Sequence, residues 1–296
     1  MRFGAVFPTQ EIGTDPVAIR EYAQAVEELG FDHLVAYDHV LGAVREPRDR
    51  PLAGPYDEND PFHEPFVLFG YLAAVTSRLE FVTGILVLPQ RQTVLVAKQA
   101  AEVSLLSGGR IRLGVGTGWN HVEFESLGAD FDARARMLTE QIPLLKRLMT
   151  EPILDYAGTF HRVDRAGMLP RPAKPVPIWC GGSSMPALKR AAEHADGFIW
   201  GSCRPTVYEQ APLVLEMVAA NGRDPQQFGL EAMVDYSAGE AEWERALQEF
   251  AKVGGTHFSF RTISAGARWM KIDAPGFTST AQHIQALERF SAICMS

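Results

Sequence analysis

Residues 79–120, LEFVTGILVLPQRQTVLVAKQAAEVSLLSGGRIRLGVGTGWN, predict one complete strand, helix and strand unit. Residues 79–88 are mostly apolar and β-branched and stop at Pro89, as a strand buried on both faces does. Residues 93–106 repeat apolar side chains at helical spacing, and a pair of glycines ends this helix because glycine tolerates a left-handed backbone. Residues 110–115 form the second strand, which must run parallel to the first because a helix joins them.

The same alternation extends along the rest of the chain. Further strands are predicted at residues 2–8, 33–37, 177–180, 197–200, 228–234 and 257–260, and helices at 16–30, 65–76, 134–149, 186–192, 206–221, 240–253 and 280–292. About eight strand and helix units is the number that closes a TIM barrel. We therefore expect an α/β fold, a (β/α)8 TIM barrel in a single domain over residues 1–296, with a doubly wound open sheet as the alternative.

Three segments depart from the alternation. Residues 42–64 are rich in proline, glycine and charge and are too long for an ordinary loop between a strand and a helix. Residues 121–132 form a second excursion, and residues 151–174 suggest a small hairpin outside the main pattern. We expect the insertions at the C-terminal face of the strands, where the first two would roof a pocket and set the choice of substrate.

Composition narrows the class of partner and the compartment. The chain has 28 Lys and Arg against 36 Asp and Glu, a formal net charge of −8, which argues against a nucleic-acid or anionic-membrane partner. No run approaches the roughly 20 apolar residues of a membrane span, and the N-terminus enters a strand at once, so we expect no signal peptide. The cysteines Cys180, Cys203 and Cys294 are scattered and odd in number, as is typical of a reducing cytoplasm, and we expect a cytoplasmic protein.

The barrel hypothesis places the chemistry. Because TIM-barrel active sites lie at the C-terminal ends of the strands, the candidate residues are those that follow each strand. They are Asp38 and His39, the backbone near Gly84, residues 116–120, residues 181–184, and Gly201 with Ser202. His39 could give or take a proton near neutral pH.

Two glycine-rich turns are candidate ligand contacts. Gly114, Gly116 and Gly118 stand at alternate positions, where they would let a flat ligand lie against bare backbone, although a plain tight turn has the same composition. The third glycine comes one residue too early for the dinucleotide fingerprint. Residues 181–184 place free amides at the start of a helix, which favours an anion such as phosphate, the alternative being a turn that Ser184 caps.

Other catalytic motifs are missing from the sequence. The histidines show no His-x-His or His-Glu-x-x-His spacing, so a metal hydrolase is unsupported and we predict no metal site. Neither a Gly-x-Ser-x-Gly elbow nor a phosphate-binding loop of the Gly-x-x-x-x-Gly-Lys type occurs, which disfavours a serine hydrolase or a P-loop enzyme.

Four motifs in one order carry a resemblance to a known family. The segments 83–89 (TGILVLP), 107–110 (SGGR), 114–120 (GVGTGWN) and 177–182 (PIWCGG) resemble the luciferase-like oxidoreductases, in particular the branch that uses the deazaflavin coenzyme F420. The likeness extends from Phe3 to Gly197 and is thin after about Phe228.

The resemblance implies a TIM barrel that holds a flavin or deazaflavin at the strand ends. It implies a bulge with a non-prolyl cis peptide at Gly84–Ile85 that supports the ring system, an Asp-His pair beside the ring at residues 38 and 39, and a phosphate-binding segment at residues 181–184. The expected cofactor contacts are Asp38, Gly84, Ile85, Gly116, Thr117, Gly118, Asn120, Gly181, Gly182, Ser183, Ser184 and Gly201.

One position departs from the family pattern. A deazaflavin-dependent sugar-phosphate dehydrogenase has a glutamate as general acid where this chain has Trp119, so we expect Trp119 to form an aromatic wall over the substrate instead. Asp38 and His39 are consecutive, and their side chains would point to opposite faces. His39 would therefore take another partner, from the long insertion or from Glu123.

These observations favour an oxidoreductase that transfers a hydride between F420 and a small organic substrate, with His39 near the reacting centre. An FMN-dependent luciferase-like monooxygenase, which needs a reductase or free reduced flavin, is the first alternative. A flavin-binding protein without turnover and a metal-dependent hydrolase are weaker alternatives. The resemblance also suggests a homodimer.

Overall fold

Eight parallel strands close into a barrel in the computed structural model, which describes residues 1–264, 267 and 273–295. The strands are β1 (Arg2–Val6), β2 (His33–Ala36), β3 (Glu80–Val87), β4 (Ile111–Gly116), β7 (Ile178–Gly181), β8 (Gly197–Ile199), β9 (Gly229–Asp235) and β10 (His257–Arg261). β1 pairs with both β2 and β10, which closes the sheet. The predicted TIM barrel is confirmed, and the open doubly wound sheet is wrong.

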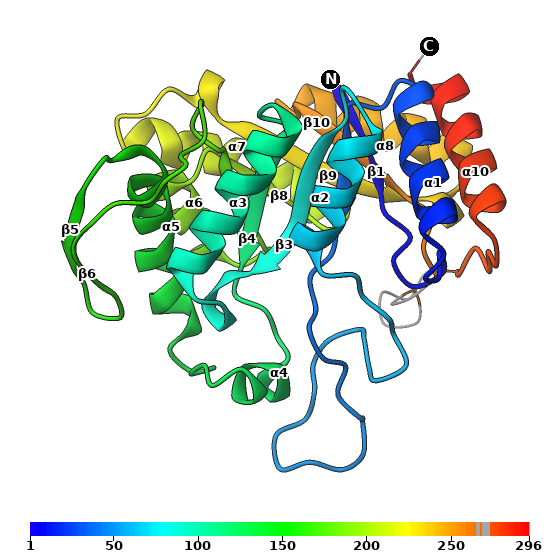
Figure 1. Cartoon of the computed structure of the whole chain (residues 1–296). Helices are drawn as coiled ribbons and strands as arrows, with labels where there is room; N and C mark the ends of the chain where they lie inside the picture. Colours follow the sequence, from blue (N-terminus) through cyan, green and yellow to red (C-terminus); the bar gives the residue numbers. More distant parts are fainter. Residues whose placement is uncertain (265–266, 268–272, 296) are drawn as a thin grey trace.

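Helices surround the barrel (Figure 1). They are α1 (Pro16–Glu28), α2 (Pro65–Val75), α3 (Thr93–Ser107), α5 (Arg134–Thr150), α6 (Met185–His194), α7 (Pro205–Ala220), α8 (Glu240–Lys252) and α10 (Thr280–Cys294). Local signals set their ends: the Asp15 side chain accepts a hydrogen bond from the Val17 amide at 2.9 Å, and Gly108 ends α3 with a φ of 70°. Ser184 occupies the N-cap position of α6, but its side chain makes no capping hydrogen bond.

Apolar side chains form the layer between the helices and the barrel, whereas the inside of the barrel contains both apolar and charged side chains. Between helices and strands lies one continuous cluster of buried apolar side chains, and a smaller cluster that includes Val35 and Met233 fills the barrel. Towards the N-terminal ends of the strands, Arg112 Nη1 donates to Glu231 at 2.7 Å and His33 Nε2 lies 2.9 Å from the same carboxylate. Burial raises the pKa of Glu231, but Arg112 and His33 outweigh burial and hold the pKa well below its usual range.

Residues 42–64 and the short helix α4 (His121–Ser126) project from the end of the barrel opposite to the two termini (Figure 1). This end is the C-terminal face of the strands, as expected. The excursion expected at residues 121–132 contains α4, which Asn120 caps: its Oδ1 accepts from the Glu123 amide at 3.4 Å. No helix in the described part of the chain is long and apolar enough to cross a membrane.

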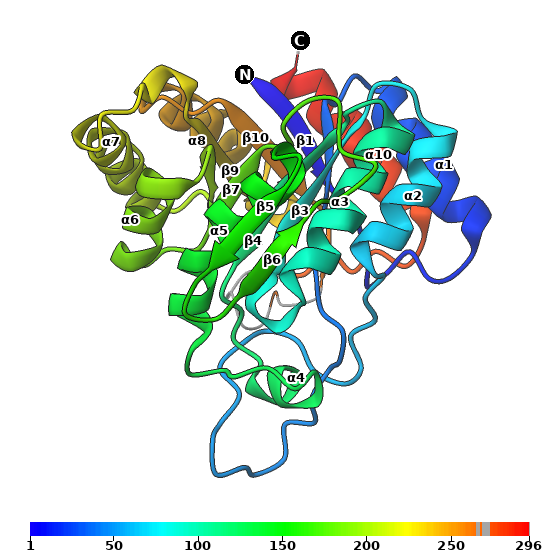
Figure 2. The ribbon, with the colours of Figure 1, turned by 60° about the vertical axis from the view of Figure 1, so that its left-hand side comes forward.

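The predicted hairpin within residues 151–174 is present, formed by β5 (Leu154–Ala157) and β6 (Arg162–Ala166). It lies on the outer side of α5, where the Glu140 carboxylate accepts from the Thr159 amide at 2.7 Å (Figure 2). This insertion does not arise at the C-terminal face. It connects the end of α5 to the start of β7, and in a parallel barrel each helix returns the chain to the N-terminal ends of the strands.

Candidate active site

A cleft of about 260 Å³ opens at the C-terminal ends of the strands, beneath the 42–64 insertion. Of the predicted site residues, Asp38, His39, Gly84, Ile85, Gly118, Trp119, Gly181, Gly182 and Gly201 line it. Tyr37, Val87, Ile199, Met233 and Arg261 complete the lining and were not predicted, together with Pro55 and Tyr56 of the 42–64 insertion, which was expected to roof the pocket. Several separate strand ends therefore converge on one cleft, as the barrel hypothesis requires.

A bulge in β3 forms one wall. The pairing of β3 with β4 shifts register between Thr83 and Leu86, and the Gly84–Ile85 peptide is cis, which confirms that prediction. Glycines make room for the Ile85 side chain: a Cβ added at Gly116 would lie 2.7 Å from Ile85 Cδ1, and one at Gly181 would lie 2.3 Å from its Cγ2. Gly116 thus supports the bulge from behind and does not itself line the cleft.

His39 is held by a carboxylate from α4. Its Nδ1 lies 3.1 Å from Glu123 Oε2, and the other oxygen of this buried carboxylate accepts from the amides of Val40 and Leu41. We expected the partner of His39 to be either a residue of the long insertion or Glu123, and it is Glu123. Because Nδ1 faces the carboxylate, Nε2 is the ring nitrogen left to meet a ligand.

Aromatic rings surround the His39 imidazole. Tyr56 and Phe62 come from the insertion, with ring centroids 5.4 Å and 4.9 Å from that of His39, and Trp119 lies at 5.4 Å. A Cβ added at Gly54 would lie 2.0 Å from the Trp119 indole, so the insertion packs closely on this ring. The imidazole therefore lies in an apolar, largely dry part of the cleft.

Asp38 serves a different partner from its neighbour. Its Oδ1 accepts from Arg91 Nη2 at 2.6 Å, and its Oδ2 accepts from the Val87 amide at 2.9 Å. Burial lowers the pKa of Arg91, but the carboxylates of Asp38 and Glu64 outweigh burial and raise it. As expected, Asp38 does not orient His39. From the end of β2, Asp38 binds Val87 at the end of β3 and Arg91 in the segment after β3.

Arg261, at the end of β10, closes the opposite side of the cleft. Its guanidinium forms two hydrogen bonds with Asp235, at 2.6 Å and 2.9 Å, and its Nη1 donates to the Tyr37 hydroxyl at 3.2 Å. Burial lowers the pKa of Arg261, but Tyr37 and Asp235 outweigh burial and raise it. A signal was present in the sequence, because a charge directly after an apolar barrel strand points to the C-terminal face.

The segment 181–184 lies at the rim, at the start of α6. Gln210 Nε2 donates to the Ser183 carbonyl at 2.8 Å and so fixes the turn. Within the described residues, the amides of Gly182, Ser183 and Ser184 have no hydrogen-bond acceptor. Both serines are exposed and lie outside the lining of the cleft. Three free amides beside a helix N-terminus are suited to an anion.

Two other predicted contacts do not reach the cleft. Asn120 is buried, and its Nδ2 donates to the Leu41 carbonyl at 3.0 Å, so it joins α4 to the residue that precedes the insertion. Thr117 is half-buried beside the wall without forming part of the lining. Across the residues that the structure describes, no group of three or more His, Cys, Asp or Glu side chains could hold a metal ion.

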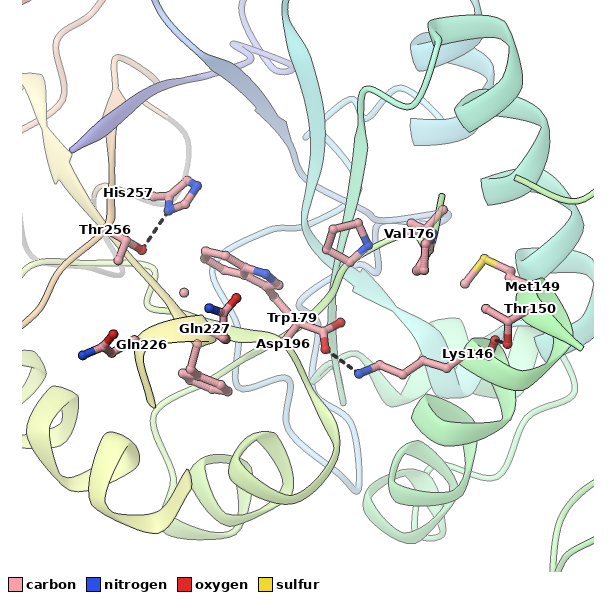
Figure 3. A pocket seen from close by; sticks show the side chains of 14 residues that line it. Lys146, Met149, Thr150, Val176, Trp179, Asp196, Gln226, Gln227, Thr256 and His257 are labelled. Carbon is pink, nitrogen blue, oxygen red and sulfur yellow. Dashed lines mark hydrogen bonds and ion pairs between the residues drawn. The ribbon is translucent and has the colours of Figure 1, made fainter. Parts of the chain in front are cut away.

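A larger cavity, of about 570 Å³, lies at the N-terminal ends of the strands (Figure 3). Trp179, the Lys146–Asp196 ion pair at 2.6 Å, and His257, whose Nδ1 lies 2.8 Å from Thr256 Oγ1, contribute to its walls. Burial lowers the pKa of His257 to about 2, so this ring is neutral. None of the predicted site residues lines this cavity, and characterised TIM-barrel enzymes use the other face. The smaller cleft is therefore the candidate site.

Comparison with known proteins gives a consistent family match. Residues 1–290 match the family model described as luciferase-like monooxygenase. An uncharacterized protein of Mycobacterium tuberculosis (strain H37Rv) is 34% identical over 203 residues, which are 67% of this chain and 70% of that protein.

Two relatives with named activities differ in their chemistry. The F420-dependent glucose-6-phosphate dehydrogenase of Nakamurella multipartita is 30% identical, with 84% of this chain and 71% of that protein covered. A pyrimidine monooxygenase of Cronobacter sakazakii is 32% identical, with 74% and 65% covered.

Solved structures share the fold. An F420-dependent secondary alcohol dehydrogenase, solved with an F420-acetone adduct, superposes with a TM-score of 0.76 at 15% identity, covering 99% of this chain and 98% of that one. At this identity the likeness concerns the fold alone.

Proposed function

The chain belongs to the luciferase-like monooxygenase family, and we propose that within this family it is an F420-dependent oxidoreductase that transfers a hydride between the deazaflavin and a small organic substrate. The observation that carries the proposal is the His39–Glu123 pair, with its 3.1 Å contact at the cleft. Oxidising an alcohol or reducing a carbonyl by hydride transfer also requires one proton to be taken or given, and a fixed imidazole does this near neutral pH.

The cleft fits a flat ring system. The bulge at Gly84 and Ile85 forms one side, and Gly201 leaves the other open, because a Cβ added there would meet no atom within 4 Å. The free amides of residues 182–184 would hold the phosphate at the rim. A deazaflavin bound in this position supplies two-electron hydride chemistry.

The side chains of this chain then have distinct tasks. His39 Nε2 takes the proton that a substrate hydroxyl loses, or returns one to a carbonyl oxygen. Glu123 keeps Nδ1 protonated, holds the ring in place and stabilises the imidazolium. Tyr56 and Trp119 exclude water from the imidazole, which strengthens every electrostatic interaction at the reacting centre.

Cofactor titration tests the proposal. The purified protein is titrated separately with oxidised F420 and with FMN, and the two dissociation constants are compared by quenching of protein fluorescence. We expect F420 to bind at least about tenfold more tightly, a difference of about 1.4 kcal/mol. Equal or tighter binding of FMN would contradict the F420 assignment.

An FMN-dependent monooxygenase is the second candidate, supported by the 32% identity to a pyrimidine monooxygenase. In that case a reductase or free reduced flavin is needed as a partner, and oxygen consumption with reduced FMN separates it from F420 chemistry. A protein that binds F420 but exchanges no hydride with alcohols, ketones or alkenes would instead be a binding protein without turnover.

A further inference from the structure

We infer that the substrate is a small, uncharged molecule of low polarity, and that phosphorylated or carboxylated compounds are excluded because the charged side chains at the cleft are already neutralised in pairs. This inference rests on the proposed function, since it names the substrate class for the same site. Three independent features of the cleft support it: the pairing of its charges, the chemistry of its walls and its size.

The pairing of charges is the first feature. Among the described residues that line the cleft, the side chains with acidic or basic groups are Asp38, His39 and Arg261, apart from two tyrosines. Asp38 faces Arg91 at 2.6 Å, His39 faces Glu123 at 3.1 Å, and Arg261 faces Asp235 at 2.6 Å. A phosphate group at Arg261 would have to displace a bidentate carboxylate that already satisfies the guanidinium.

The space next to Arg261 is balanced in the same way. A second cavity of about 190 Å³ adjoins the cleft, with Met233 and Arg261 common to both linings. Its charged lining residues are two arginines and two carboxylates: Arg204, Arg261, Asp235 and Glu242. An anion that extended beyond Arg261 would therefore meet carboxylates as well as cations, with no net attraction.

The walls are the second feature. Trp119, Tyr56 and Met233 face the cleft together with Ile85, Val87 and Ile199. Burial raises the pKa of Tyr56, so its hydroxyl stays neutral at any physiological pH. Such walls favour apolar surface and offer a few polar groups to orient one hydroxyl or carbonyl.

Size is the third feature. The cleft of about 260 Å³ is smaller than the roughly 300–1,000 Å³ of pockets that hold drug-sized ligands, and the cofactor ring must share it. The free amides of residues 182–184 lie at the rim, where the cofactor phosphate is proposed to bind, so they are not available to a substrate anion. Only a small substrate fits in the space that remains.

A matched pair of ligands tests the inference by binding and not by turnover. Cyclohexanol and cyclohexyl phosphate have the same ring and differ in the phosphate group, which adds two negative charges and bulk, and each is titrated calorimetrically into the F420-loaded protein. We expect cyclohexanol to bind at least tenfold more tightly. Equal or tighter binding of cyclohexyl phosphate would overturn the inference, and this comparison needs no variant.

Removing the carboxylate that neutralises Arg261 should shift the preference from cyclohexanol towards cyclohexyl phosphate. In Asp235→Asn, Arg261 loses its bidentate carboxylate, and we expect affinity for cyclohexyl phosphate to rise at least tenfold while that for cyclohexanol changes less than threefold. Asp164→Asn, at an exposed aspartate of β6, makes the same chemical change away from the cleft and should alter neither value. An unchanged preference in a folded Asp235→Asn protein would also overturn the inference.

The outcomes separate this inference from the proposed function. Failure to bind F420 in the cofactor titration refutes the proposed function. A protein that binds F420 and also prefers cyclohexyl phosphate refutes only the substrate class.

Discussion

His39 Nδ1 lies 3.1 Å from Glu123 Oε2, although 84 residues separate the two in the chain. His39 follows β2 and Glu123 lies in α4, which follows β4, and because these strands run parallel their C-terminal ends lie at one face. The same carboxylate accepts from the amides of Val40 and Leu41, which directly precede the insertion. One side chain of α4 therefore positions both the imidazole and the roof above it.

Replacing the imidazole should slow chemistry without weakening cofactor binding. For His39→Ala we expect turnover to fall by about 10²–10⁴-fold, the range that general acid-base catalysis contributes, with the dissociation constant for F420 nearly unchanged. Steady-state kinetics and fluorescence titration measure the two effects. His194→Ala, on α6 away from the cleft, is the control. A loss of F420 affinity with full turnover at saturation would make His39 a ring contact instead.

Removing the charge of Glu123 should act through His39. In Glu123→Gln the amide oxygen can still accept from the Val40 and Leu41 amides, but it no longer provides a carboxylate for Nδ1. We expect kcat to fall by between about 10 and 10⁴-fold, the upper value being the loss when the carboxylate of a serine-protease triad becomes an amide. KM and F420 affinity should change little. Exposed Glu125 on the same helix gives the control Glu125→Gln, and an unaltered kcat would show that Glu123 only braces the roof.

The turn before α6 should govern cofactor affinity. Gly182 has a φ of 140°, and a valine there would carry a side chain beside the three free amides. We expect Gly182→Val to weaken F420 binding by an order of magnitude or more, with circular dichroism close to wild type. Gly222→Val, at an open site with a φ of 71° after α7, also places a valine at a positive φ, but outside the cleft. Equal F420 affinity in a folded Gly182→Val protein would remove the phosphate assignment.

The buried network near the N-terminal face should give a pH-dependent stability. Glu231→Gln leaves Arg112 without its 2.7 Å charge partner, and breaking such a buried pair costs about 3–5 kcal/mol in the free energy of unfolding. The folded-state pKa of Glu231 is depressed, so its stabilisation is complete above the unfolded value of about 4.3 and is lost as pH falls towards the folded value.

Urea denaturation at a series of pH values measures this effect. The stability difference between wild type and Glu231→Gln should be present at about pH 5 and should shrink below about 4.3. Glu244→Gln, at an exposed position of α8, should show no such difference. A difference that grew on acidification would contradict the assigned charge state.

We propose that a second copy of the chain covers the apolar outer faces of α2 and α3. Val67 on α2 is 73% exposed and Leu106 on α3 is 65% exposed, and these neighbouring helices also expose Tyr71, Val94 and Leu95. Large apolar side chains that are exposed on neighbouring helices can mark an interaction site. We expect a dimer by light scattering, and a monomer after Val67→Asp with Leu106→Asp. Ile153→Asp, at a 63% exposed position beside the hairpin, should leave the dimer intact, and a monomeric wild type would refute the proposal.

Local sequence patterns were sufficient to predict much of the architecture. The runs at 79–88 and 93–106 match β3 and α3 to within about a residue, because strand and helix periodicity record which side chains are buried. The resemblance located the cis peptide at Gly84–Ile85 and the imidazole of His39. It also named Gly116 and Asn120 as ligand contacts, although both lie behind the cleft wall.

The sequence by itself determined the alternation of strands and helices, the barrel that this alternation predicts, and the strand ends from which chemistry could come. Only the tertiary structure decided which side chains meet there. Arg261 donates to Tyr37, which lies 224 residues away in the chain. The partner of His39 is Glu123 and not a residue of the 42–64 insertion. The physical reason is that burial leaves a periodic record along the chain, whereas a pair formed by barrel closure depends on strand register and loop path, which no local pattern contains.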